Sequence, residues 1–220
     1  MEFLSQFVEF CLHLDRHLTE LTQDYGTWTY AILFVVVFCE TGLVVTPFLP
    51  GDSLLFAAGS VAALGGLRIE VLCIVLVIAA VVGDAVNFHI GRWIGPRAFT
   101  GKLRFLKPQH LERTREFYAR RGAFTIVLAR FVPIIRTFAP FVAGIGRMNY
   151  AQFVFYNVFG AVLWVGSIAF AGYLFGHLPI VKGNFSLVVL GIIVVSLIPL
   201  VVEYFRARAK RPPDPARVDK

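Results

Sequence analysis

Two segments of the chain repeat one arrangement of charge and helix-breaking proline. A charged residue precedes a proline by ten positions in each, Glu40 before Pro50 and Arg130 before Pro140. A phenylalanine stands two places before each proline, and an Ala-Gly pair follows it. Both segments are apolar enough to lie in a lipid bilayer, where a charge and a broken helix are each costly. Paired interrupted segments in corresponding halves point to the binding site of a transporter.

The composition predicts an integral membrane protein. Of the 220 residues, 57% are hydrophobic and only 16% are charged, whereas about a quarter of a soluble domain is charged. The net charge of +7 comes from basic residues grouped in two blocks beside long apolar runs, as in cytoplasmic loops. This grouping argues against a nucleic-acid partner. The three cysteines are widely spaced and have no histidine at ligand spacing, so we expect no metal site, disulfide framework or cofactor.

The first third of the chain predicts a surface helix followed by an interrupted segment. Apolar residues recur every three or four positions over residues 1–28, which favours an amphipathic helix that ends at Gly26. The uncharged run before Glu40 is shorter than the ~20 residues that a span needs. We therefore expect a re-entrant hairpin of two half-helices over residues 29–64. A single kinked spanning helix is the alternative, because such helices tolerate proline.

Three long apolar runs predict full transmembrane helices, at residues 69–90, 150–175 and 183–204. Gly91 and Arg92 are expected to close the first of them. Residues 122–146 repeat the hairpin pattern, with interruptions at Pro133 and Pro140. The membrane domain therefore covers residues 29–205, and residues 206–220 form a basic, flexible tail.

Charge sets the expected topology. Residues 91–121 and 206–220 are rich in basic residues, which places both segments and the C-terminus in the cytoplasm. The first of these segments contains an amphipathic stretch from His110 to Arg121. The hairpin 122–146 must then enter and leave from the cytoplasmic side, and the hairpin 29–64 from the outside. The predicted fold is all-α, with an inverted repeat of two opposed re-entrant hairpins, about three full spans and an N-terminal amphipathic helix.

Four ionisable residues in the hairpins are the candidate site. The planar guanidinium groups of Arg130 and Arg136 suit the oxygens of a phosphate. Glu40 and Asp52 can exchange protons, because a carboxyl group buried away from water binds a proton more readily. A carboxylate pair beside an arginine pair can couple proton movement to the release of an anionic group. The supporting positions are Thr46, Pro50, Gly51, Asp84, Thr137 and Pro140.

Structural explanations compete for several of these residues. Glu40 could pair with Arg130, and Asp52 with Arg136, only to neutralise charge, and Asp52 could instead cap the helix that follows. Thr46 and Thr137 could bond a ligand or satisfy freed backbone groups. Asp84 suits a proton path or a helix end near water. Gly51, Gly59 and Gly144 are expected to allow close packing.

Three ordered motifs resemble the DedA family of bacterial inner-membrane proteins, which share the VTT (SNARE-associated) domain. The motifs are Phe38–Gly59 with its Glu-Thr-Gly and Thr-Pro-Phe-Leu-Pro-Gly-Asp sequences, Gly83–Arg92, and Ala129–Gly144 with Arg-Phe-Val-Pro and Arg-Thr-Phe-Ala-Pro. The resemblance runs over about residues 1–205. It implies two opposed re-entrant hairpins, a multi-pass protein of the bacterial inner membrane, and a role in lipid transport.

The resemblance also implies a substrate and site roles. Family members are associated with moving undecaprenyl phosphate across the membrane, and related members with phosphatidylethanolamine. Dependence on the proton motive force is attributed to acidic residues that match Glu40 and Asp52, and the essential arginines match Arg130 and Arg136. All four positions are filled here as the family pattern expects.

The expected function is a proton-motive-force-linked transporter of an anionic lipid, undecaprenyl phosphate or a related phospholipid. The expected partners are that lipid, protons and the membrane, and the sequence is compatible with a homo-oligomer. A proton–cation antiporter and an uncoupled phospholipid scramblase are the alternatives. A lipid-phosphate phosphatase would need a histidine nucleophile. Neither hairpin contains histidine, so we expect a protein that is not an enzyme.

Overall fold

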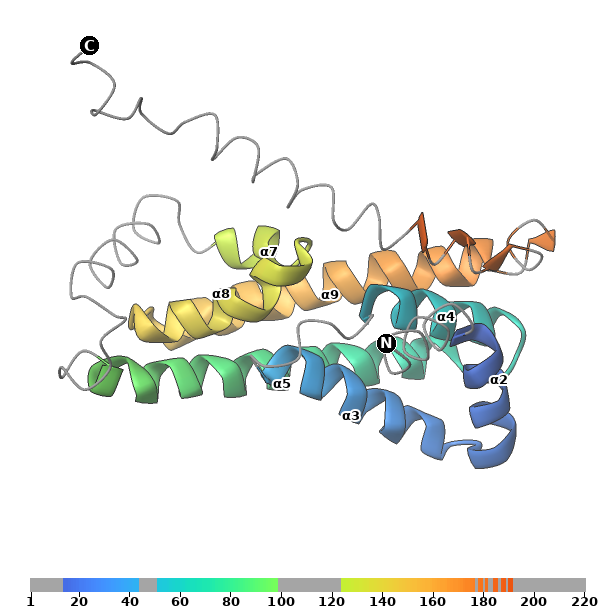
Figure 1. Ribbon diagram of the computed structural model, residues 1–220, viewed down its shortest axis with the longest axis horizontal. Helices are drawn as coiled ribbons and strands as arrows, with labels where there is room; N and C mark the ends of the chain where they lie inside the picture. Colours follow the sequence, from blue (N-terminus) through green and yellow to red (C-terminus); the bar gives the residue numbers. More distant parts are fainter. Residues whose placement is uncertain are drawn as a thin grey trace, which may run out of the picture.

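The computed structural model describes residues 14–43, 51–98 and 124–176, together with isolated residues between 178 and 191. Within these ranges every regular element is a helix (Figure 1). The prediction of an all-α chain is therefore confirmed for the described residues. The helices are α2 (Leu14–Tyr25), α3 (Trp28–Gly42), α4 (Gly51–Ala63), α5 (Ile69–Ala98), α7 (Thr125–Ala129), α8 (Pro133–Ile145) and α9 (Tyr150–Phe175).

Helix α2 has one apolar face and one polar face. Leu14 and Leu18 are buried, whereas Glu20 is exposed. The helix packs against α3 and α4. It is followed by Gly26, whose φ of +52° is a backbone angle that glycine adopts without steric cost. Residues 1–13 of the predicted amphipathic segment lie outside the described residues.

Helices α3 and α4 are both too short to cross a bilayer. They contain 15 and 13 residues, whereas a span needs ~20. Eleven of the residues of α4 are buried, so this helix lies inside the bundle. The predicted sites Thr46 and Pro50 fall in the segment between the two helices, outside the described residues. The re-entrant hairpin over residues 29–64 therefore stays a prediction.

Within the described ranges, two helices are long and apolar enough to cross a membrane. They are Ile69–Gly95 within α5 and Tyr150–Phe175, which is α9. The prediction that Gly91 and Arg92 close the first span is wrong, because α5 continues to Ala98. Gly91 is buried against the backbone of Phe141 in α8, so it serves close packing and not helix termination.

The second interrupted segment breaks once, between α7 and α8. Val132 is extended, with φ −116° and ψ 108°, a conformation that a following proline favours, because its ring crowds the helical region of the residue before it. Pro133 then begins α8. The prediction that Pro140 also interrupts the segment is wrong, because Pro140 lies inside α8. A proline removes only one helical hydrogen bond, and in a membrane helix the surrounding structure can compensate for it.

Each half of the chain packs one of its short helices against the long helix of the other half. Helix α4 packs against α9, and α8 packs against α5. The short helices that precede the breaks stay within their own half, since α3 packs against α5 and α7 against α9. The two long helices also contact each other and run along the long axis of the molecule (Figure 1). This exchange in both directions is what two repeats related by a two-fold axis would make.

Glycines allow the α4–α9 pair to approach closely. A Cβ atom on Gly59 would overlap the carbonyl oxygen of Ala169, and one on Gly172 would overlap the carbonyl oxygen of Phe56. Each helix therefore contributes a glycine to the crossing. Small residues at helix crossings are typical of membrane proteins, in which close backbone packing replaces much of the hydrophobic driving force.

The α5–α8 pair has the same arrangement. A Cβ atom on Gly91 would overlap the carbonyl oxygen of Phe141, and one on Gly144 would overlap that of Phe88. The close packing predicted at Gly59 and Gly144 is present at both crossings.

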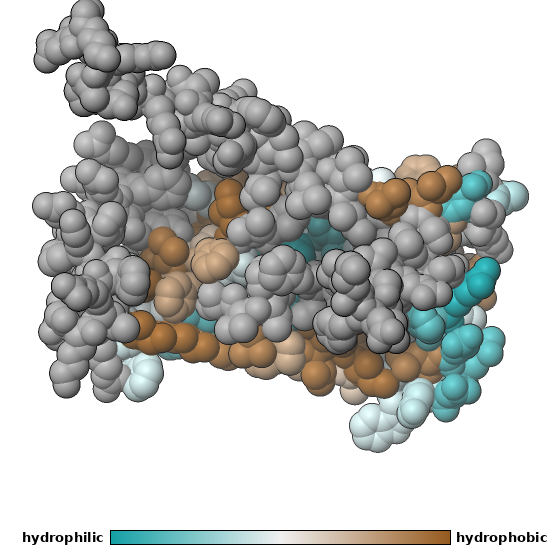
Figure 2. All heavy atoms as spheres, in the orientation of Figure 1, coloured by the Kyte–Doolittle hydropathy of each residue, from teal (hydrophilic) through white to brown (hydrophobic). Residues whose placement is uncertain are grey.

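Apolar side chains cover much of the outside of the described bundle. Exposed examples on α5 include Ile74 and Ile78, and Phe155 and Leu174 are exposed on α9. Figure 2 shows hydrophobic residues along the molecule and hydrophilic ones gathered at the end where α2 lies. Contiguous apolar surface of this extent is unusual for a soluble monomer.

Several predicted segments fall outside the described residues. They are the basic stretch between α5 and α7, the basic tail at 206–220, and most of the span at 183–204. The expected orientation of the termini therefore stays a prediction.

Candidate functional site

Arg136 joins the ends of α3 and α4. It lies in the first part of α8, which the proline at its start positions directly after the chain break. Its Nη2 donates to Oε1 of Glu40, near the end of α3, and its Nη1 donates to Oδ1 of Asp52 over 2.6 Å. Asp52 lies in the first turn of α4. One guanidinium group therefore holds two carboxylates that come from helices on either side of the first break.

These three groups are withdrawn from solvent. The side chains of Arg136, Glu40 and Asp52 are 7%, 1% and 16% exposed. The Glu40 carboxylate lies against Gly51, the first residue of α4, and a Cβ atom at Gly51 would overlap both of its oxygens. Glycine at this position therefore makes room for the carboxylate.

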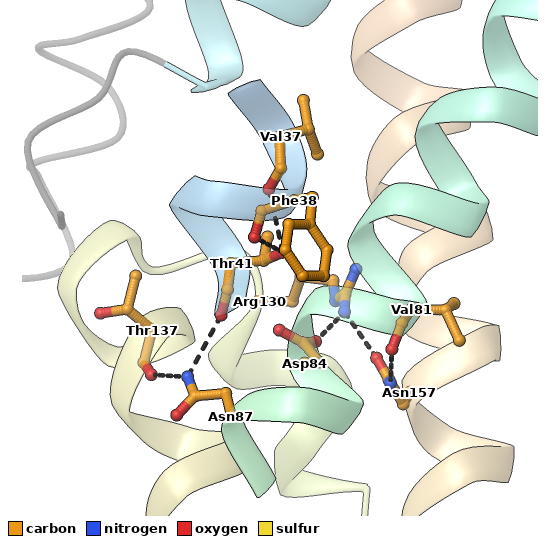
Figure 3. A network of polar contacts seen from close by, with 9 residues as sticks. All are labelled: Val37, Phe38, Thr41, Val81, Asp84, Asn87, Arg130, Thr137 and Asn157. Atoms are coloured by element: carbon orange, nitrogen blue, oxygen red, sulfur yellow. Dashed lines mark hydrogen bonds and ion pairs between the residues drawn. The ribbon is translucent and has the colours of Figure 1, made fainter. Parts of the chain in front are cut away.

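Arg130 forms a second buried ion pair. It follows α7 and donates through Nη2 to Oδ2 of Asp84 in α5 and, over 2.6 Å, to Oδ1 of Asn157 in α9. Asn157 in turn donates to the carbonyl oxygen of Val81 over 3.1 Å. Figure 3 shows Arg130 reaching between α5 and α9 to these partners. The side chains of Arg130 and Asp84 are 4% and 6% exposed.

Trp164 lies between the two ion pairs. The guanidinium carbons of Arg130 and Arg136 are 5.8 Å and 4.9 Å from the centroid of its ring. Its Nε1 donates to Oδ1 of Asp52 over 2.9 Å. A desolvated guanidinium group over an indole ring gains ~2 kcal/mol or more. Trp164 therefore contacts both arginines and one carboxylate.

The arginines keep unused hydrogen-bonding capacity. Nη1 of Arg130 and Nε of Arg136 are buried and have no hydrogen-bond partner among the described residues. Buried donors are normally satisfied, so each such atom calls for an explanation. Two buried guanidinium groups with donors to spare, both over one aromatic ring, can accept an anion.

A neutral amide lies beside the charged groups. Nδ2 of Asn87 donates to the carbonyl oxygens of Thr41 and Thr137, over 3.1 Å and 2.7 Å (Figure 3). It thereby ties α5 to α3 and α8. The backbone of Thr137, one of the predicted positions, takes part in this contact.

The structure brings together most of the residues that the sequence singled out. Glu40, Asp52 and Arg136 are in direct contact, and Arg130 shares Trp164 with them. The predicted pairing of Glu40 with Arg130 is wrong, since Glu40 pairs with Arg136. The placement of Asp84 at a helix end near water is also wrong, because α5 continues to Ala98 and buries it.

Three residues of the site escaped the sequence reasoning: Trp164, Asn157 and Asn87. A signal for Asn157 existed, because a polar amide in an uncharged span usually faces the interior of the bundle. Trp164 follows it by seven positions, which places both on one face of α9.

Comparison with known proteins places these residues in a family. The model of the VTT domain matches residues 49–174. The chain is 52% identical to protein DedA of Escherichia coli over 94% of this chain and 95% of that protein. It is 40% identical to an uncharacterized membrane protein of Mycobacterium tuberculosis, over 87% and 88% of the two chains. It is 34% identical to the E. coli inner membrane protein YqjA over 82% of each. No solved structure matches the chain.

Proposed function

Because the chain belongs to the DedA family of VTT-domain membrane proteins, we propose that it moves an anionic lipid across the bacterial inner membrane. The substrate is undecaprenyl phosphate or a related phospholipid, and transport is linked to the proton motive force. The head group binds at Arg130 and Arg136, and the apolar tail stays in lipid. The two interrupted segments act as opposed re-entrant hairpins.

One observation carries this proposal. Two buried guanidinium groups lie over the ring of Trp164, and each keeps a donor with no partner among the described residues. A buried charge is retained in a membrane protein only at considerable cost, so it marks a functional site by default. Guanidinium donors match a phosphate group in geometry and charge.

The carboxylates supply the link to protons. Glu40 and Asp52 share one arginine, so an anion that takes Arg136 leaves the charge of this carboxyl pair buried without a counter-ion. Protonation removes the cost of that unpaired charge. A proton gradient can therefore drive the exchange of the head group for the carboxylates.

A cation site fits the described residues less well. Each carboxylate of the site pairs with an arginine, which repels a metal ion at the same place. No cluster of three metal-ligating side chains occurs within the described ranges. A proton–cation antiporter is therefore treated as one outcome of the test.

The test is lipid movement in liposomes that contain the purified full-length protein. We expect transfer of undecaprenyl phosphate between leaflets, accelerated by a pH gradient and abolished by Arg136→Ala. Arg68→Ala is the matched control, because Arg68 is exposed and lies away from the ion pairs. Unchanged transfer in Arg136→Ala would contradict the proposal.

Two further outcomes separate the alternatives. Exchange of protons for cations without lipid movement would indicate an antiporter. Lipid movement that is insensitive to the pH gradient would indicate an uncoupled scramblase.

A further inference from the structure

Among the described residues, the buried site contains more negative than positive groups. Arg130 and Arg136 face the carboxylates of Glu40, Asp52 and Asp84, which come from α3, α4 and α5. Helix α9 contributes only neutral groups to the described site, the indole of Trp164 and the amide of Asn157. Two cations and three anions leave one negative charge in excess when every group is ionised.

The charges divide into two local sets on either side of Trp164. Arg136 serves Glu40 and Asp52, so this set can hold one proton and become neutral. Arg130 serves Asp84 alone among the carboxylates and is neutral as a pair. Asp84 therefore has an arginine to itself among the described carboxylates, whereas Glu40 and Asp52 share one.

Asp84 occupies the position that an anion at Arg130 would need. Nη2 of Arg130 is fully engaged by Asp84 and Asn157, while Nη1 has no partner within the described part of the chain. A phosphate group that approaches through Nη1 and takes both nitrogens must displace the Asp84 carboxylate. That carboxylate is then buried with no counter-ion, which is costly unless it is protonated.

Building on the function proposed above, we propose that Asp84 is the counter-ion that an anionic head group displaces from Arg130, and that the displaced carboxyl group takes up a proton. Asn157 keeps a hydrogen bond to Arg130 during the exchange and holds the guanidinium group in place. The head group that fits is a phosphomonoester with two negative charges, one for each arginine.

The proposal predicts a proton count. Binding of a dianion releases Asp84 from Arg130, and it releases the one ionised carboxylate of the Glu40–Asp52 pair from Arg136. Two protons are taken up in total. Because the proton is bound together with the ligand, each proton taken up makes the dissociation constant rise about tenfold for every unit by which the pH increases.

The test is calorimetric binding of farnesyl phosphate to the full-length protein in nanodiscs, from pH 7 to 8.5, where a phosphomonoester is close to a dianion. Buffers with different heats of ionisation report the number of protons taken up. We expect about two for the unmodified protein. An uptake of one proton or none overturns the inference without any variant.

Asp84→Asn should change the affinity for farnesyl phosphate in the direction opposite to that expected from structural damage. Removing the competing carboxylate should tighten binding at pH 8 by about tenfold or more, and should lower proton uptake by one. Asp84→Glu keeps the carboxylate and should bind with the pH dependence of the unmodified protein. Tighter binding is a result that a merely structural role for Asp84 would not give.

The failures of the two proposals are distinguishable. If farnesyl phosphate does not bind the unmodified protein at any pH, the transport of a phosphate lipid is contradicted, and this inference with it. If it binds, but Asp84→Asn binds with the same affinity and the same proton uptake, only the role of Asp84 is overturned.

Discussion

The guanidinium carbon of Arg136 lies 4.9 Å from the centroid of the Trp164 ring. The same tryptophan donates its Nε1–H to Asp52, which accepts from Arg136 on the same oxygen. The aromatic ring and the carboxylate therefore hold the arginine from two directions. A site built in this way resists small rearrangements of α8 relative to α4 and α9.

Substitutions of Trp164 should separate its two contacts. Trp164→Phe keeps an aromatic face below the arginines and loses the hydrogen bond to Asp52, which as a bond to a charged group is worth about 1.5–3 kcal/mol. Trp164→Leu loses the aromatic face as well, at a further ~2 kcal/mol or more. Lipid transfer should be slowed in the first variant and abolished in the second, and denaturant unfolding should rank their stabilities in that order. Equal effects of the two substitutions would contradict the contact between the ring and the arginines.

Removing Arg136 should damage the fold through the charges that it leaves behind. Arg136→Met strands Glu40 and Asp52 in the interior, and breaking a buried ion pair costs about 3–5 kcal/mol. The triple variant Glu40→Gln, Asp52→Asn, Arg136→Met contains no buried charge at this point. Its unfolding free energy should return close to that of the unmodified protein, while lipid transfer stays absent. Recovery of transfer in the triple variant would show that these charges are not needed.

Gly51 should not tolerate even one methyl group. A Cβ atom there would overlap the Glu40 carboxylate, so Gly51→Ala should displace Glu40 from Arg136 and reduce lipid transfer by about tenfold, as expected for ~1.4 kcal/mol.

Gly166→Ala is the matched control for Gly51→Ala, because a Cβ atom at Gly166 meets nothing within 4 Å. This variant should transport normally and be up to ~1 kcal/mol more stable, since alanine favours a helix interior. Normal transfer in Gly51→Ala would rule out the close contact.

Asn87 should contribute to stability more than to chemistry. Asn87→Leu removes the donor to the carbonyl oxygens of Thr41 and Thr137, and an unsatisfied buried acceptor costs about 1–3 kcal/mol. The midpoint of thermal unfolding should fall, while transport at low temperature persists. Ser167→Leu, at an exposed position of α9, should leave the midpoint unchanged. An unaltered midpoint in Asn87→Leu would indicate that the amide holds no helices together.

The sequence was sufficient for the helical character of the chain and for the location of its unusual charges. Hydropathy alone marks α5 and α9, because a run of apolar residues long enough to span has few alternatives to a helix. Glu40, Asp52, Arg130 and Arg136 stood out because charge is rare in such surroundings. These inferences depend on local composition, which a single sequence displays directly.

The pairing of side chains within the site could not be predicted from the sequence, because it depends on how the helices pack. Asp84 meets Arg130 across 46 positions of sequence, and Asp52 meets Trp164 across 112. Helix ends misled for a related reason. Gly91 and Pro140 are common helix breakers, but tight packing between α5 and α8 keeps both within continuous helices.

Because each short helix after a break packs against the long helix of the other half, the described helices form two blocks that can move as rigid bodies. One block joins α4 to α9 through Gly59 and Gly172, and the other joins α5 to α8 through Gly91 and Gly144. The bond from Trp164 to Asp52 lies inside the first block, whereas Arg136 belongs to the second and reaches across the seam. Releasing Arg136 from Asp52 therefore removes an ionic contact between two rigid units, each of which contains helices from both halves of the chain.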